Sequence, residues 1–143
     1  VLYRHAENHF WLSPGDGDAL LWAKGVAAQS GLEVTVREPD ASPLQLQGPL
    51  APRVAHKLFG DLAIELGYYH FCHTSLEGIP VVLSRTGWSG ELGYEIILKE
   101  GRKGTALWDR VWKRVPSSTS KLPALPWHAV WKARCSLTAV ISP

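Results

Sequence analysis

Several features that are common in small domains are absent from this 143-residue sequence. It contains no methionine, starts at Val1, and has only two cysteines, Cys72 and Cys135, which are too few for a disulfide framework. No apolar run approaches the length of a membrane span, and no basic start precedes one as in a signal peptide. We therefore expect an internal fragment of a longer protein, located in the cytoplasm and without a membrane partner.

A concentration of charge of one sign is also lacking. The 15 Lys and Arg residues and the 13 Asp and Glu residues are spread along the chain without a basic block. Nucleic acids and membrane surfaces attract proteins through such blocks, so neither is an expected partner. The charge pattern favours a small or nonionic ligand.

The hydrophobic periodicity predicts helices and strands in mixed order. Alternating or β-branched segments predict strands at residues 10–13, 32–38, 43–47, 68–76, 79–86 and 93–100. Apolar residues at helical spacing predict helices at residues 18–29, 53–66 (one or two short helices) and 105–114. Glu77-Gly78 and WSGELG are typical hairpin connections, so the last three strands should form an antiparallel β-meander. Mixed helices with such a meander indicate an α+β fold.

The segment RTGWSGELGYEI, residues 85–96, combines three glycines, a tryptophan and two glutamates. In a strand that starts at Gly93, Tyr94 and Glu95 point to opposite faces, so one of them faces the packed side. A carboxylate among apolar neighbours lies either at a water-exposed strand end or against a ligand that donates paired hydrogen bonds. The glycines let another group approach the backbone closely, and Trp88 offers a flat stacking surface. A planar heterocycle with adjacent N–H donors would suit both Glu95 and Trp88.

This segment resembles the R-T-G-Y-T-G-E-x-G-F-E-I segment of the glycine-cleavage T-protein family, the tetrahydrofolate-dependent aminomethyl and methyl transferases. All three glycines and both glutamates are shared. LQLQGPLA, residues 44–51, is similar to the L-x-L-Q-G-P-x-A of that family; we interpret Gln47 as a packing residue and Gly48-Pro49 as a turn. The resemblance covers residues 1–112 and implies a partial folate-binding T-protein-like domain there, with tetrahydrofolate as cofactor.

The resemblance implies ligand-binding roles for three residues. Glu95 matches the family glutamate that binds the amino and ring N–H groups of the pterin. Trp88 matches an aromatic residue of the folate pocket and keeps the ring of the usual tyrosine without its hydroxyl. Arg85 also matches, although a hairpin-anchoring ion pair with Glu91 explains it at least as well. The family's acidic residue nearest to folate N5 would lie upstream of Val1, so no catalytic residue is assigned.

Several functions stay open within the family. WLSPGDGDALLWAKGVAAQSGLEV, followed by EPDASPLQLQGP, resembles the dimethylsulfoniopropionate demethylase branch, whose members move a methyl group from a sulfonium to tetrahydrofolate. The hairpin is closer to the aminomethyltransferase branch, which acts in glycine cleavage and would add a lipoyl carrier protein as partner. In either branch, folate N5 attacks the carbon of an activated donor that is held in place. A non-catalytic folate-binding domain or an inactive fragment would also fit the sequence.

Residues 113–143 do not continue the family pattern. The family continues to an R-x-E-A-G motif with a following Y-G, which this tail lacks. Back-translation of Trp127 to Ser142 into a neighbouring reading frame permits a string that has the motif. We hypothesise that the tail is translated out of frame from a point between Trp112 and Trp127, which the DNA sequence can test. Such a tail would be poorly ordered, and Cys135 would have no role.

HFCH, residues 70–73, is the main candidate for a metal site. On a strand, His70 and Cys72 face one way and His73 the other, and no second ligand cluster follows. Half-exposed strand histidines explain the pattern better, so we predict no metal site. A calcium loop, a P-loop and a dinucleotide-binding glycine motif are also lacking.

Overall fold

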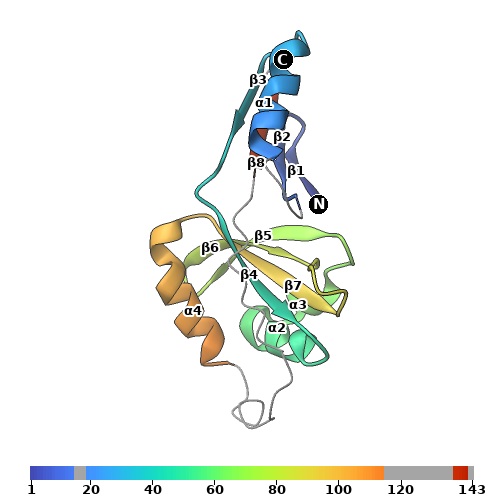
Figure 1. Cartoon of the computed structure of the whole chain (residues 1–143). Helices are drawn as coiled ribbons and strands as arrows, with labels where there is room; N and C mark the ends of the chain where they lie inside the picture. The colour runs from blue at the N-terminus through green and yellow to red at the C-terminus, as the bar shows by residue number, and fades with distance from the viewer. Residues whose placement is uncertain (15–18, 115–136, 142–143) are drawn as a thin grey trace. The chain divides into compact units, whose positions relative to one another are not determined.

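The computed structural model describes residues 1–14, 19–114 and 137–141 (Figure 1). The chain divides into two compact units: residues 1–40 with 134–143 form the first unit, and residues 41–133 form the second unit. Each unit contains a four-stranded sheet and at least one helix. The predicted α+β class is therefore confirmed.

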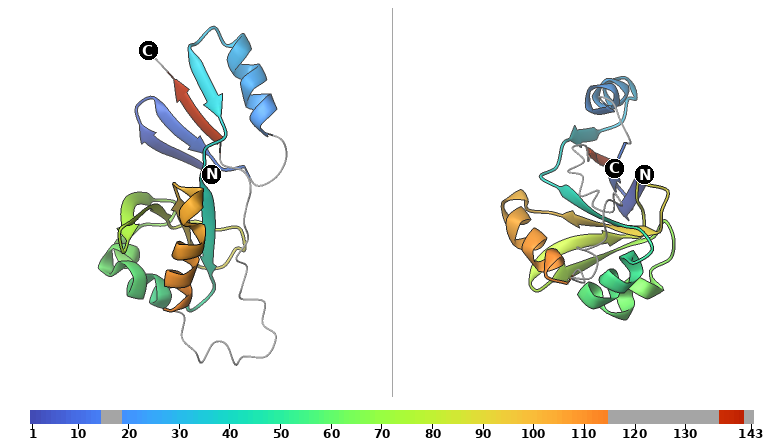
Figure 2. Two further views of the ribbon diagram at one scale, coloured as in Figure 1. Left: turned by 90° about the vertical axis from the view of Figure 1, so that its left-hand side faces the viewer. Right: turned by 60° about the horizontal axis from the view of Figure 1, so that its bottom comes forward.

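The first unit is built on an antiparallel sheet with the strand order β1-β2-β8-β3 (Figure 2). Its strands are β1 (Leu2–Ala6), β2 (His9–Leu12), β3 (Val34–Arg37) and β8 (Leu137–Ile141). Tyr3 of β1 lies opposite Trp11 of β2, and both side chains are buried. Because directly opposed aromatic residues stabilise a strand pair, this pairing favours the β1–β2 hairpin.

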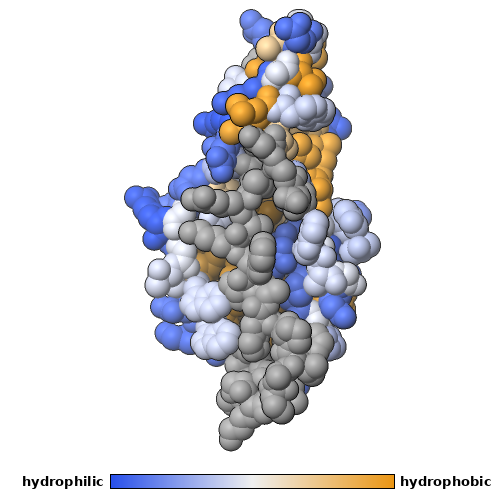
Figure 3. Space-filling view, in the orientation of Figure 1, coloured by the Kyte–Doolittle hydropathy of each residue, from blue (hydrophilic) through white to orange (hydrophobic). Residues whose placement is uncertain are grey.

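Helix α1 (Ala19–Gln29) connects β2 and β3 in the sequence and contains no buried residue. Leu21, Trp22 and Val26 are exposed. Apolar surface accordingly lies over this helix in the space-filling view (Figure 3). The sequence predicts the helix but not its exposure, because helical spacing identifies an apolar face without identifying what covers it. The sequence also offers Asp16 or Asp18 as an N-cap of this helix, and both residues lie outside the described part of the chain.

Part of the tail, residues 113–143, belongs to the first sheet. Strand β8 pairs antiparallel with β2 on one side and with β3 on the other. The sequence of this strand, LTAVI, is rich in β-branched residues, which favour strands. The expected poor order of the tail stays a prediction. Residues 115–136 and 142–143 lie outside the described residues. The out-of-frame origin of the tail stays a prediction.

The second unit is built on an antiparallel sheet with the strand order β4-β7-β6-β5 (Figure 2). Its strands are β4 (Ser42–Gln47), β5 (Phe71–Leu76), β6 (Ile79–Ser84) and β7 (Gly93–Leu98). Strands β5, β6 and β7 form the predicted meander. Strand β4 pairs with β7, which brings the two glutamines of LQLQ beside the β6–β7 hairpin.

The helices of the second unit are α2 (Ala51–Phe59), α3 (Asp61–Glu65), the 3-10 helix η1 (Gly101–Lys103) and α4 (Gly104–Trp112). The helical segment predicted at residues 53–66 is two helices, because Gly60 interrupts it with a left-handed backbone (φ +65°). No helix in the described part of the chain has both the length and the apolarity needed to cross a bilayer.

One face of the second sheet packs into the hydrophobic core. Tyr94, Ile96 and Leu98 alternate along β7, and each is at most 1% exposed. Residues from β6 and from three helices complete this core: Val81, Leu83, Ala51, Ala55, Ala63, Leu107 and Val111. Because strand side chains alternate, Glu95 points to the opposite face of the sheet.

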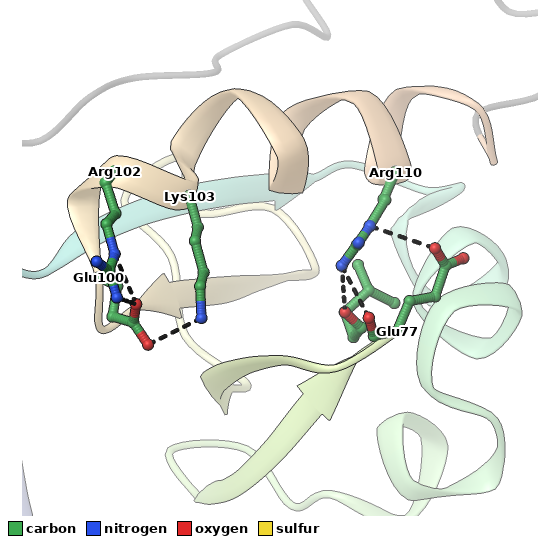
Figure 4. A network of polar contacts seen from close by, with 6 residues as sticks. Glu77, Glu100, Arg102, Lys103 and Arg110 are labelled. Atoms are coloured by element: carbon green, nitrogen blue, oxygen red, sulfur yellow. Dashed lines mark hydrogen bonds and ion pairs between the residues drawn. The ribbon is translucent and has the colours of Figure 1, made fainter.

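Helix α4 is tied to the β5–β6 turn by Arg110 (Figure 4). Arg110 Nη1 donates hydrogen bonds to the carbonyls of Leu76 (3.0 Å) and Glu77 (2.9 Å), and Nε lies 3.3 Å from Glu77 Oε2. Glu77 (φ +47°) and Gly78 (φ +81°) both have the left-handed backbone that a two-residue type I′ hairpin turn requires. Arg110 therefore holds this strained turn against the helix.

Candidate functional site

Four polar residues lie together on the face of the second sheet that is opposite the apolar core. In the register of the sheet, Glu95 of β7 lies opposite Gln45 of β4 and Ser84 of β6. Thr86 follows Ser84 by two residues and contacts both Ser84 and Glu95. We call Gln45, Ser84, Thr86 and Glu95 the polar row.

Glu95 is the centre of the polar row. It is only 7% exposed, so it is not the water-exposed strand-end carboxylate that was one of the two expected arrangements. Gln45 Nε2 donates a hydrogen bond to Glu95 Oε1 (3.3 Å), and Thr86 Oγ1 donates one to Glu95 Oε2. Thr86 Oγ1 also lies 2.8 Å from Ser84 Oγ. Because the single Thr86 hydroxyl proton goes to Glu95, Ser84 is the donor in this last contact.

This arrangement equips Glu95 to recognise a hydrogen-bond donor. Burial of a carboxylate is costly unless donors compensate for the lost water, and Gln45 and Thr86 supply one donor to each oxygen. An ionised carboxylate has about four acceptor positions on its two oxygens. Two adjacent N–H groups of a ligand would match the two oxygens, and such paired bonds to a charged group are strong.

The connection between β6 and β7, residues 85–92, is organised by Gln47 of β4. We call these residues the hairpin loop. Gln47 Nε2 donates to the carbonyls of Thr86 (3.3 Å) and Tyr94 (3.4 Å), and Gln47 Oε1 accepts a hydrogen bond from Ser89 Oγ (2.8 Å). A Cβ atom at Gly87 would overlap the Gln47 carboxamide. The group that approaches the hairpin backbone is therefore the Gln47 side chain, which packs against the hairpin and also forms hydrogen bonds with it.

Trp88 occupies the hairpin loop next to Gly87. Its side chain is 73% exposed. Within the described part of the chain, the indole has no aromatic or cationic stacking partner. The ring is therefore accessible to a planar ligand, and its position depends on the backbone of the hairpin loop.

The structure places Arg85 at the start of the hairpin loop. Arg85 Nη1 donates to the carbonyl of Leu66 at the end of α3 (2.9 Å), and the Arg85 backbone exchanges hydrogen bonds with Tyr69 and His70. No ion pair joins Arg85 to Glu91 among the described residues. Arg85 thus anchors the hairpin to a helix end rather than to Glu91. Its role in folate binding stays a prediction.

The HFCH segment has the geometry that the sequence predicts for its strand residues. Cys72 lies opposite Leu83 and packs against the core, whereas His73 lies opposite Val82 on the other face. Burial raises the pKa of the Cys72 thiol. His70 precedes β5, and its Nδ1 lies 3.0 Å from the carbonyl of Tyr68. The residues that the structure describes contain no group of three potential metal ligands.

Four residues of the site were not recognised from the sequence: Gln45, Gln47, Ser84 and Thr86. One signal for two of them was present in LQLQ, because alternation places both glutamines on one face of a strand. Their partner strand was not predictable from local pattern, because Gln45 and Glu95 are separated by 50 positions. Thr86 and Ser84 precede the hairpin and resemble ordinary strand residues in the sequence.

The fold and the site together define an antiparallel α+β domain in which a buried, hydrogen-bonded glutamate adjoins a glycine-rich hairpin. The sequence model of the GCVT N-terminal domain matches residues 1–121, and the chain belongs to this family. The family resemblance inferred from the hairpin is therefore confirmed.

Curated relatives of different activities match the same part of the chain. The chain is 35% identical over 109 residues to a dimethylsulfoniopropionate demethylase of Ruegeria pomeroyi. This match covers 76% of this chain and 30% of the relative. It is 32% identical over 115 residues to an aminomethyltransferase of Desulfitobacterium hafniense, covering 78% and 31% respectively. It is 33% identical over 124 residues to a trimethylamine-oxide aldolase of Ruegeria pomeroyi, covering 79% and 16%. The chain thus spans less than a third of the length of these relatives.

Proposed function

We propose that this chain is the folate-binding part of a tetrahydrofolate-dependent one-carbon transferase. The observation that carries the proposal is the polar row, in which buried Glu95 receives one hydrogen bond from Gln45 and one from Thr86. The pterin of tetrahydrofolate has adjacent amino and ring N–H donors, which match the two oxygens of such a carboxylate. Membership of the GCVT N-terminal domain family supports the same ligand.

Glu95, Trp88 and Arg85 would each have a different role in binding tetrahydrofolate. Glu95 would accept the paired N–H groups and thereby orient the pterin in its plane. Trp88 would stack on the ring, since its indole is exposed beside the small residues of the hairpin loop. Arg85 would support the site through its position at the hairpin. Bound tetrahydrofolate would supply a nucleophilic nitrogen that accepts the one-carbon unit; we assign no catalytic residue.

We propose a methyl group on a sulfonium, such as dimethylsulfoniopropionate, as the donor. The 35% identity to a demethylase of that substrate supports this choice. The alternative is aminomethyl transfer in glycine cleavage with a lipoyl carrier protein, which the aminomethyltransferase relatives support. A sulfonium donor already carries a good leaving group, so the protein would need to supply little acid or base chemistry.

Calorimetric titration of tetrahydrofolate into the 143-residue chain tests the ligand. Glu95→Gln should weaken binding by about 10- to 100-fold, because hydrogen bonds to a charged group are worth about 1.5–3 kcal/mol. Glu91→Gln is the matched control, since Glu91 is exposed in the same hairpin loop and should change the affinity by less than about twofold. Absence of binding, or equal losses in both variants, would reject the folate site.

The donor is tested separately with dimethylsulfoniopropionate that carries ¹³C in its S-methyl groups. Appearance of the label on tetrahydrofolate in the nuclear magnetic resonance spectrum would establish demethylation. Label transfer from an aminomethylated lipoyl carrier protein would establish aminomethyl transfer. Tetrahydrofolate binding without transfer from either donor would favour a non-catalytic folate-binding domain.

A further inference from the structure

The carboxamide of Gln47 joins three separate parts of the β6–β7 hairpin. Its Nε2 bridges the carbonyl of Thr86, before the turn, and the carbonyl of Tyr94, after it. Its Oε1 accepts the hydroxyl proton of Ser89 near the tip. Ser89 Oγ in turn accepts the backbone N–H of Glu91 (3.2 Å). One side chain therefore fixes both stems of the hairpin and its tip.

Two glycines make room for this contact. A Cβ atom at Gly87 or at Gly93 would overlap the Gln47 carboxamide. Neither glycine has a left-handed backbone, so their turn geometry does not by itself require glycine. Gly90, with φ +76°, is the glycine of this hairpin that the turn itself requires. Gly87 and Gly93 are thus explained by the space that the Gln47 side chain occupies, and Gly90 is explained by the turn.

Strand β4 also reaches the polar row. Gln45 and Gln47 are two positions apart, so both project from the same face of β4. Gln45 lies opposite Glu95 and donates to its carboxylate, whereas Gln47 lies opposite Gly93 and binds the hairpin loop. The two glutamines therefore hold the two parts of the proposed site, the carboxylate and the loop that carries the indole.

We propose that Gln47 is a positioning residue that presents the Trp88 ring to the ligand. This inference rests on the proposed function. Trp88 lies between Gly87 and Ser89, both of which contact Gln47, and its exposed ring has no stacking partner within the described residues. The backbone that Gln47 holds therefore sets the point from which the Trp88 ring extends. Such preorganisation raises affinity, because the loop loses less freedom when the ligand binds.

Ser89→Ala isolates this restraint in the 143-residue chain. It removes the hydroxyl that joins the loop tip to Gln47 and leaves the two donor contacts of Gln47 in place. We expect tetrahydrofolate affinity to fall by about 3- to 10-fold, the effect of losing a typical hydrogen bond. Gln47→Ala should have at least the same effect. Ser75→Ala and Gln29→Ala are matched controls at exposed residues and should bind as the wild type does.

A double-mutant cycle with Trp88→Ala distinguishes an effect on the placement of the indole from a general loss of stability. If Gln47 acts through the indole, Ser89→Ala should weaken binding by less than about twofold once the indole is gone. Hydrogen exchange of the amides of residues 85–92 should be faster in Ser89→Ala and Gln47→Ala than in the controls, without ligand. A merely structural role would leave the loss of affinity the same in both backgrounds.

The outcomes distinguish this inference from the proposed function. If the wild type binds tetrahydrofolate but Ser89→Ala binds equally well, or loses the same factor with and without Trp88, the positioning role is wrong and the folate site stands. If the wild type does not bind, or Glu95→Gln and Glu91→Gln behave alike, the folate site is wrong and this inference falls with it.

Discussion

Strand β7 is buried on both faces, but Glu95 on one face is held by different forces from the core residues on the other face. On the core face, Ile96 and Leu98 pack against apolar side chains, and the stabilisation comes from area removed from water. On the opposite face, Glu95 is held by directional hydrogen bonds from Gln45 and Thr86. The apolar contacts therefore support the fold in general, whereas the hydrogen bonds fix the orientation of one carboxylate.

This difference separates stability from ligand binding. A buried hydrogen-bonded network contributes modestly to stability, because the same groups bond to water in the unfolded chain. It nevertheless sets the direction of each acceptor, which a ligand with paired donors depends on. Substitutions on the core face should therefore change the free energy of unfolding most, and substitutions in the polar row should change ligand affinity most.

The largest loss of stability is expected for Ile96→Ala. Ile96 is 0% exposed in the core, and truncation of such a residue leaves a cavity that costs about 3–4 kcal/mol. Urea unfolding of the 143-residue chain measures the loss. Ile64→Ala is the matched control, because Ile64 is 49% exposed and should lose less than about 1 kcal/mol. Similar losses in the two variants would contradict the assignment of the core face.

A smaller loss is expected for Thr86→Val, which keeps the shape of the side chain and removes its hydroxyl. The buried carboxylate of Glu95 loses one donor and Ser84 loses its acceptor, so the cost should be about 1–3 kcal/mol. Thr86→Ser keeps the hydroxyl and should restore most of this stability, measured by urea unfolding at neutral pH. Tetrahydrofolate affinity should follow the same order. Equal free energies of unfolding for the valine and serine variants would show that the Thr86 hydroxyl does not stabilise Glu95.

Gly87→Ala tests the connection between the hairpin loop and β4. The added Cβ would displace the Gln47 carboxamide and its hydrogen bonds, which should cost about 1–2 kcal/mol. In a Gln47→Ala background the same substitution should cost almost nothing. Gly90→Ala is the control, because its left-handed backbone makes the substitution unfavourable in both backgrounds. If Gly87→Ala costs the same with and without Gln47, the two residues are not coupled.

The sequence predicts most of the second unit because its signals are local. The β5–β6–β7 meander follows from apolar alternation and from Glu77-Gly78, which favours a tight turn. Alternation also places Tyr94 and Glu95 on opposite faces, and the structure confirms that Tyr94 faces the core. The pairing of β4 with β7 is not local, since periodicity identifies the face of a strand but not its neighbour.

The candidate site was predictable only where its residues are chemically unusual for their surroundings. Glu95 stands out because a carboxylate follows three glycines and lies near the start of an apolar strand. Gln47 does not stand out, because glutamine is common on half-exposed strands and its partners lie across the sheet. Two glycines of the hairpin, Gly87 and Gly93, were the available sign of this contact. They leave space for the side chain of Gln47, which is distant in the sequence. The central position of β8 in the first sheet was equally hidden, because β8 is far in sequence from β2 and β3.

The smallest effect is expected for Tyr94→Phe, which removes the one hydroxyl that the core face of β7 carries. Tyr94 Oη donates to the carbonyl of Ala63 in α3 (3.0 Å), and loss of this bond should cost about 1 kcal/mol. Burial raises the pKa of the Tyr94 hydroxyl, and the charge of Arg85 opposes this shift only in part.

The raised pKa predicts how this cost depends on pH. The folded state keeps Tyr94 protonated longer than the unfolded state, so the stabilisation is complete below the unfolded pKa of about 10 and is lost as pH rises through the folded pKa. The difference in unfolding free energy between the wild type and Tyr94→Phe should therefore be constant from pH 7 to 9 and shrink above about pH 10. Tyr69→Phe, at a 62% exposed residue, is the control and should lose less than about 0.5 kcal/mol. A difference that grows above pH 10 would mean that the folded state favours the ionised phenol, contrary to a ring buried against the core.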